Sequence, residues 1–317
     1  MPVLLQGDLP HWFHLVAQSE IGECNRITAP RSAMQPCKGG LIHIMKKSLK
    51  LLVLVAAALT LFSATGCSKL RARDQLNKGV QAYKSAKYEE AIERFKNAVE
   101  LDPSLINARL YLATAYEQQY IPGADTPENN RMAEQAITEF NNVLQRDPNN
   151  IIAIKSIASL YLQQKKFDQA KEYYRKAIQV DANDPEAYYS IAVIDWTQAY
   201  QPRMEERNKL GLKPEDSLAA KDKKVCQAVQ TKNTPYVDEG MQMLNKAIEL
   251  RPDYDDAMAY LNLMWREKAD IECGDTAART QDLKTADEWV DKTLAVKKAK
   301  AEKAGPAGGI VNDTDQK

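Results

Sequence analysis

Histidine is missing from most of this chain, because His11, His14 and His43 are its only histidines and all precede residue 44 of 317. The rest of the sequence therefore offers no Ser-His-Asp or Cys-His nucleophile and no metal site that needs an imidazole. Long hydrophobic runs are missing too. The longest extends from Leu51 to Phe62, and a helix that spans a bilayer needs about 20 apolar residues. We expect no catalytic site, no metal site and no membrane-spanning helix.

An excess of charge of one sign is also absent. From residue 67 onward the chain has 37 Lys or Arg residues and 40 Asp or Glu residues, which are interspersed along the sequence. This balance lacks the basic footprint of a nucleic-acid-binding protein. Charges distributed in this way are typical of solvated helix faces, so we predict no nucleic-acid partner and no cofactor.

A secretory signal is present over residues 45–66. Lysines within residues 46–50 precede the apolar run, and the small residues 64–66 lead into Cys67. This order of a basic, an apolar and a small-residue segment is typical of an export signal. The cysteine that follows resembles the bacterial lipobox. The resemblance implies cleavage before Cys67, lipidation of Cys67, and a protein tethered to a membrane of the cell envelope, facing the periplasm, with the outer membrane favoured. An ordinary cleaved signal or a short anchor is the alternative.

Three other segments flank the region with repeats. Residues 1–44 show no helical or strand periodicity. Because secretory signals act from the amino terminus, we expect translation to start at Met45 and residues 1–44 to be an over-extended, disordered reading frame; a real extension is the alternative. Residues 67–71 are expected to form a short lipidated tether. Residues 297–317 are charged and contain Gly and Pro, so they are expected to form a disordered tail.

From residue 72 onward the sequence repeats a helical pattern. Each unit contains a small residue, an apolar or aromatic residue four positions later, and another small residue three positions after that. Residues of the preceding helix that approach closely are also small, such as Gly79, Ala113, Ala158 and Ala192. The five sets are Ala91/Phe95/Ala98, Ala136/Phe140/Val143, Ala170/Tyr174/Ala177, Gly240/Leu244/Ala247 and Ala286/Val290/Thr293.

This pattern resembles the 34-residue tetratricopeptide (TPR) repeat, most clearly in KGVQAYKSAKYEEAIERFKNAVELDP (78–103). The resemblance implies an all-α superhelical solenoid of about five helix hairpins over residues 72–296. Extra residues fall between the paired helices, and the longest insertion, 200–236, is expected to form a small helical flap. The expected units are 72–105, 106–150, 151–184, 185–254 and 255–296, and the shorter insertions are 121–131 and 268–280.

From residue 67 onward, two cysteines remain if Cys67 is lipidated. Cys226 lies in the second insertion and Cys273 in the third, on the same edge of adjacent units. An even pair in an oxidising compartment favours a disulfide, and two free thiols are the alternative. Closing this loop would stabilise the fold by about 4 kcal/mol in the chain-entropy model.

The first helices of TPR solenoids line a concave groove that binds peptides or partner helices. Lys155 and Asn77 are isolated, so the Lys- and Asn-rich clamp that holds a carboxylate terminus in some TPR domains is absent. Taken together, the residues expected to line the groove favour an apolar or aromatic-bearing peptide, although single residues could instead belong to the core. The groove candidates are Arg73, Leu76, Asn77, Tyr83, Leu110, Tyr111, Lys155, Tyr189, Trp196, Tyr260, Leu263 and Arg266.

We therefore interpret the chain as a non-enzymatic, membrane-anchored periplasmic lipoprotein. It would act as a protein-binding scaffold or adaptor in envelope assembly, through its groove or its insertion edge. Two alternatives remain. One is a self-assembling, homo-oligomeric module, and the other is an enzyme built on the carboxylates Glu205, Glu206, Asp255, Asp256, Glu272 and Asp275.

The lipobox resemblance predicts the chemistry of the mature amino terminus. Mass spectrometry of protein extracted from membranes should show a chain that begins at Cys67 and carries the added mass of acyl groups. Cys67→Ser should move the protein into the aqueous fraction. A wild-type protein that is water-soluble and unacylated would contradict the interpretation.

Overall fold

The computed structural model describes residues 67–213 and 216–304, and all regular structure in these ranges is helical. The expected extension 1–44, the expected signal 45–66 and the last part of the expected tail, 305–317, lie outside the described residues. No helix in the described ranges is long and apolar enough to cross a bilayer.

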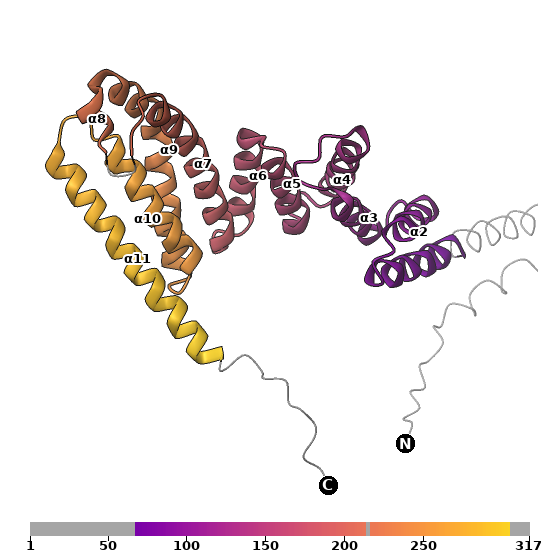
Figure 1. Cartoon of the computed structure of the whole chain (residues 1–317). Coiled ribbons are helices and arrows are strands. Elements are labelled where there is room, and N and C mark those ends of the chain that lie inside the picture. Colours follow the sequence, from indigo (N-terminus) through magenta and orange to yellow (C-terminus); the bar gives the residue numbers. More distant parts are fainter. Residues whose placement is uncertain (1–66, 214–215, 305–317) are drawn as a thin grey trace, which may run out of the picture. The chain divides into compact units, whose positions relative to one another are not determined.

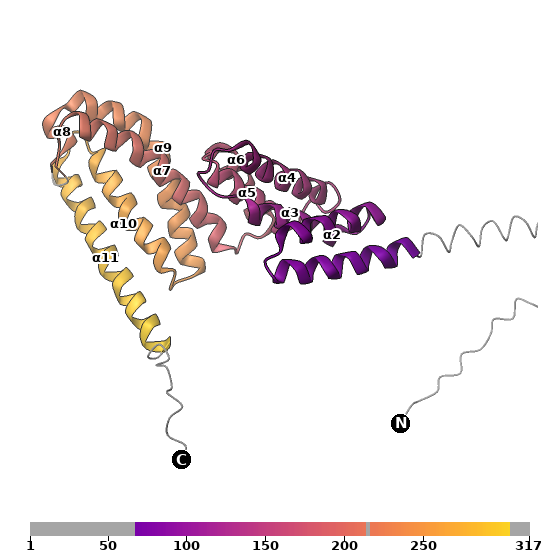
Figure 2. The same cartoon turned by 45° about the vertical axis from the view of Figure 1, so that its right-hand side comes forward.

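The helices follow one another as hairpins (Figures 1 and 2). The pairs are the helix over 67–84 with α2, α3 with α4, α5 with α6, α7 with α9, and α10 with α11, and each hairpin packs on the next. The predicted all-α solenoid of helix hairpins is thereby confirmed. The labelled helices are α2 (Tyr88–Leu101), α3 (Ile106–Gln119), α4 (Pro127–Leu144), α5 (Ile151–Gln163), α6 (Phe167–Val180), α7 (Pro185–Lys209), α8 (Leu218–Lys221), α9 (Lys223–Leu250), α10 (Asp255–Asp270) and α11 (Thr276–Ala304).

Small residues allow the two helices of a hairpin to approach closely around one large side chain. In the first hairpin the Phe95 ring is fully buried between Ala91 and Ala98. A Cβ atom built on Gly79 would lie only 2.5 Å from Cε1 of Phe95, so the ring occupies the space that a larger residue would need. Phe140 fills the same place in the second hairpin. The fifth hairpin departs from this pattern, since its Val290 is only half-buried.

The longest insertion forms no flap separate from its hairpin. Instead it lengthens both helices of the fourth hairpin, because α7 continues through Pro202 to Lys209 and α9 already begins at Lys223. The extended helices bury an apolar cluster of their own, which includes Leu218 and Val229. This local core explains why the inserted residues continue the repeat helices rather than leave them.

Two helix boundaries differ from those expected from the sequence. Residues 67–71 are part of the continuous helix over 67–84 and form no separate tether. The predicted tail is helical up to Ala304, because Ala and Lys are strong helix formers and Lys300 of α11 pairs with Asp255 of α10 at 2.6 Å.

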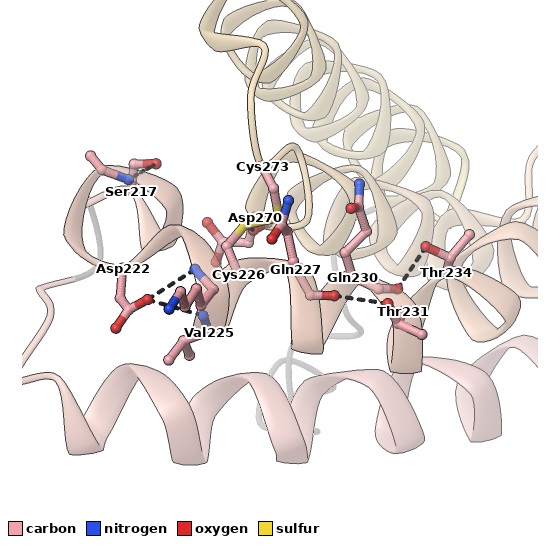
Figure 3. The surroundings of a disulfide bond; sticks show 12 residues. Ser217, Asp222, Val225, Cys226, Gln227, Gln230, Thr231, Thr234, Asp270 and Cys273 are labelled. Carbon is pink, nitrogen blue, oxygen red and sulfur yellow. Dashed lines mark hydrogen bonds between the residues drawn. A yellow bond between two sulfur atoms is a disulfide. The ribbon is translucent and has the colours of Figure 1, made fainter.

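A disulfide joins the fourth and fifth hairpins (Figure 3). The Sγ atoms of Cys226 on α9 and Cys273 in the α10–α11 loop lie 2.05 Å apart, and both residues are buried. Next to it, the Asp222 carboxylate accepts hydrogen bonds from the amides of Lys224 and Val225, which caps α9. The disulfide therefore links the α10–α11 loop to α9, whose first turn is capped by Asp222.

The close contact at Gly79 makes a prediction for stability. Gly79→Ala should lower the free energy of unfolding by about 1–3 kcal/mol, because the added methyl group overpacks the Phe95 ring. Chemical denaturation measures the change. Gly274→Ala is the control, since a Cβ at Gly274 would meet nothing within 4 Å. Equal stability of the two variants would contradict this packing.

Candidate binding site on the first helices

Four aromatic side chains form a continuous row on α7 and α10, here called the aromatic row: Tyr189, Trp196, Tyr200 and Tyr260. The Trp196 ring stacks on Tyr200 with centroids 4.7 Å apart. Tyr260 meets the rings of Tyr189 and Trp196 edge-on, at 5.5 Å in each case. Edge-to-face pairs at these separations are favourable, so the rings support one another in a defined arrangement.

Helical spacing and packing together place the row. Trp196 follows Tyr189 by seven residues and precedes Tyr200 by four, so the three side chains share one face of α7. Helix α10 packs beside α7 and brings Tyr260 against them. Tyr189, Trp196 and Tyr260 pack with their inner edges against the core cluster that contains Ala192. All four residues of the row stay half-buried, so each has an outer edge available to a partner.

Burial also decides the ionisation of the tyrosines. Desolvation raises the pKa of Tyr189 and of Tyr260, and the Asp256 carboxylate adds to both shifts. Tyr254, which precedes α10 and packs 5.1 Å from Tyr189, has its pKa raised to about 12 by burial. These phenols therefore stay neutral at physiological pH.

The structure brings together Tyr189, Trp196 and Tyr260 of the groove candidates, and Leu263 lies half-buried one turn further along α10. Sequence reasoning missed Tyr200 and Tyr254. Tyr200 could have been found by extending the α7 stripe by one turn, whereas no helical period indicates Tyr254, because it precedes α10.

The other aliphatic and aromatic candidates are engaged within their own hairpins or with the next one. Tyr83 meets Tyr88 edge-on at 5.4 Å, and Tyr111 stacks on Phe95 at 5.6 Å. Leu76 and Leu110 pack against the core of the first hairpins. None of them joins the aromatic row.

Two of the four polar candidates form ion pairs. Lys155 binds Asp184 at 2.7 Å and Glu186 at 3.1 Å, and Arg266 binds Asp287 at 2.7 Å. Asn77 and Arg73 are exposed on the first described helix. Lys155 and Arg266 are thus committed to holding neighbouring helices together.

A buried ionic cluster lies on another face of α7, at Asp195. The Lys171 ammonium donates to Asp195 Oδ1 at 2.5 Å and to Glu239 Oε2 at 2.6 Å, which joins α6, α7 and α9. Asp195 is fully buried, and its Oδ2 has no hydrogen-bond partner among the described residues. Burial raises the pKa of Asp195 to about 7, although Lys171 opposes this shift.

A second ionic cluster fixes α7 to α10. Arg203 contacts buried Glu267 at 2.7 Å and Asp270 at 2.6 Å, and Arg207 contacts Asp270 at 3.1 Å. Removing one partner of a buried ion pair typically costs 3–5 kcal/mol, so the two clusters together fix the orientation of the helix that carries most of the row.

The carboxylates considered for an enzyme form no comparable site. Asp255 pairs with Lys300, Glu206 pairs with Lys209, and Glu205 is exposed. Over 67–213 and 216–304, no group of three or more His, Cys, Asp or Glu side chains could hold a metal ion.

Comparison with known proteins decides the type of repeat. Residues 79–119 match a TPR repeat model, and residues 130–194 match a second tetratricopeptide repeat model. Residues 79–119 and 130–194 therefore carry tetratricopeptide repeats. The two models cover the first three TPR hairpins and the start of the fourth, and they end before the insertion that lengthens α7.

Several solved structures are similar to this chain. A MamA protein aligns with a TM-score of 0.50 and 14% identity over 75% of this chain and 98% of its own. A MamA from Desulfovibrio magneticus RS-1 scores 0.48 at 16% identity over 72% and 96%. YrrB, described as a TPR protein with an unusual peptide-binding site, scores 0.44 at 16% identity over 71% and 90%. No curated protein matches the chain.

The buried Asp195 predicts a pH dependence of stability. Its raised pKa means that the folded protein holds a proton between about pH 4 and 7 that the unfolded chain has released, so its contribution to stability falls as the pH rises through this range. From pH 5 to 7 the loss should be on the order of 2 kcal/mol. The free energy of unfolding of Asp195→Asn should lack this pH-dependent component. The Asp168→Asn variant, which changes an exposed residue, should retain it. A wild-type slope equal to that of Asp195→Asn would refute the assignment.

Proposed function

We propose that this TPR protein is a scaffold that binds another protein, and that the aromatic row is the surface it uses. The observation that carries the proposal is the clustering of Tyr189, Trp196, Tyr200 and Tyr260 on adjacent first helices. Tyr and Trp dominate the energetic centres of protein interfaces because they bury a large area at little conformational cost. The ionic clusters around Lys171 and Arg203 hold α7 in place before binding, which lowers the entropy lost on association.

We further propose that the scaffold is anchored to a membrane of the cell envelope through acyl chains on Cys67 and faces the periplasm. The lipobox resemblance and the exposed Cys67 thiol support this proposal. Leu70 is 71% exposed within one turn of Cys67, and the helix continues from there into the first hairpin. An acyl anchor at Cys67 would hold that hairpin at the lipid surface without a flexible linker.

Basic side chains near the anchor fit the same arrangement. Lys69, Arg71 and Arg73 are all exposed on the first helical turns. Each could contribute about 1 kcal/mol of attraction to an anionic lipid surface. In this position the protein would act as an adaptor in envelope assembly, with its binding surface on the fourth and fifth hairpins.

Substitution of Trp196 tests the binding surface. Wild-type protein, captured from detergent-solubilised membranes, should bring down a stoichiometric partner, and Trp196→Ala should weaken that binding by about 2 kcal/mol or more, roughly 30-fold. Trp265→Ala is the matched control, because Trp265 packs against the same core cluster but lies about 140° around α10 from Tyr260.

Two outcomes would contradict the proposal. Equal loss of the partner in both variants would mean that Trp196 acts only through stability. A discrete oligomer of the pure protein in light scattering, dissociated by Trp196→Ala and not by Trp265→Ala, would show that the row binds a second copy of the chain.

A further inference from the structure

An exposed carboxylate stands at one end of the aromatic row. Asp256 precedes Tyr260 by four residues on α10, so the two side chains share a helix face. Asp256 forms no ion pair within the described part of the chain, whereas the neighbouring Asp255 is paired with Lys300 at 2.6 Å. In agreement with this placement, the Asp256 charge adds to the raised pKa of Tyr260 and, behind other causes, to those of Tyr189 and Tyr254.

The charged side chains that border the row from α7 and α10 are occupied elsewhere. Glu186 pairs with Lys155 and Arg251. Arg203 pairs with buried acids of α10, and Arg266 pairs with Asp287 of α11. Asp256 is therefore the exposed, negatively charged residue beside the row that has no ion-pair partner among the described residues, and Lys300 of α11, which pairs with Asp255, interacts with it only at longer range.

Guanidinium groups already lie over Tyr200, at one end of the aromatic row, and over Tyr254, which contacts Tyr189 of the row. Arg251 lies 4.5 Å from the Tyr254 ring centroid, and Arg203 lies 5.3 Å from that of Tyr200. Among the described residues, no Lys or Arg lies over the rings of Tyr189, Trp196 or Tyr260, which are the middle of the surface. Aromatic faces attract cations because the ring quadrupole is negative above the plane.

We infer that the aromatic row and Asp256 together recognise a partner segment that carries a Lys or Arg side chain next to an apolar residue. The cation lies against the rings of Tyr189 and Tyr260 and pairs with Asp256. The apolar neighbour contacts Trp196 and the half-buried Leu263. The inference rests on the proposed binding function and adds the charge of the partner, since a carboxylate at this place would meet both Asp256 and the negative ring faces.

Fluorescence anisotropy of labelled peptide pools tests the inference. Three pools of twelve-residue peptides share apolar flanks and differ only in a central Lys, norleucine or Glu. The full chain in detergent should bind the Lys pool at least tenfold more tightly than the Glu pool at low salt, and added salt should reduce the difference. Asp256→Asn should lower the affinity for the Lys pool to that for the norleucine pool. Asp291→Asn, an exposed change on α11, should leave all three affinities unchanged.

The outcomes separate the inference from the proposed function. Equal binding of the three pools, with no effect of Asp256→Asn, overturns the inference and leaves the row as a binding surface, provided that Tyr260→Ala weakens all three. Tighter binding of the Glu pool also overturns the inference alone. Both the inference and the proposed function are overturned if no pool binds and the Trp196→Ala variant captures its partner as well as the wild-type protein does.

Discussion

The fit of one large side chain between small residues of paired helices is the contact on which this protein depends. Where the partner is glycine, as at Gly79, the Phe95 ring almost touches the backbone of the other helix. In the second hairpin the small residues Ala113 and Ala136 are buried in the same cluster as Phe140. Because each hairpin also packs on the next, such contacts build a series of buried clusters that are joined through partly buried residues such as Leu144 and Met243.

The fourth hairpin has buried contacts beyond those that the repeat pattern requires. Its helices are lengthened by the insertion, and their extensions bury a separate apolar cluster and the disulfide between Cys226 and Cys273. Buried ion pairs at Lys171 and Arg203 connect α7 to the helices on either side. Buried ion pairs of this kind add little net stability but permit few alternative arrangements. They suit a helix whose exposed face must present an ordered set of aromatic rings.

How much of the candidate site is predictable from sequence depends on the type of contact. Tyr189, Trp196 and Tyr260 could be placed on first helices because the repeat fixes their helical register. Tyr111 occupies an equally favourable position, yet its ring stacks on Phe95, and the pattern did not indicate this. Helical register likewise places Lys155 in the groove. In the structure, however, Lys155 forms an ion pair with Asp184. Register states which face a residue occupies, but the neighbouring helix decides what the side chain contacts.

By itself the sequence determined the helical hairpins, their order, and the positions of the insertions, because small and large residues recur at fixed spacings that only stacked helices satisfy. Tertiary structure alone decided that the insertion extends α7 and α9, that α11 continues to Ala304, and that four aromatic rings meet beside an exposed Asp256. These features arise from contacts between residues about 45 to 70 positions apart, as between Arg203 and Glu267 or Asp255 and Lys300. No local period in a sequence encodes the distance between such partners.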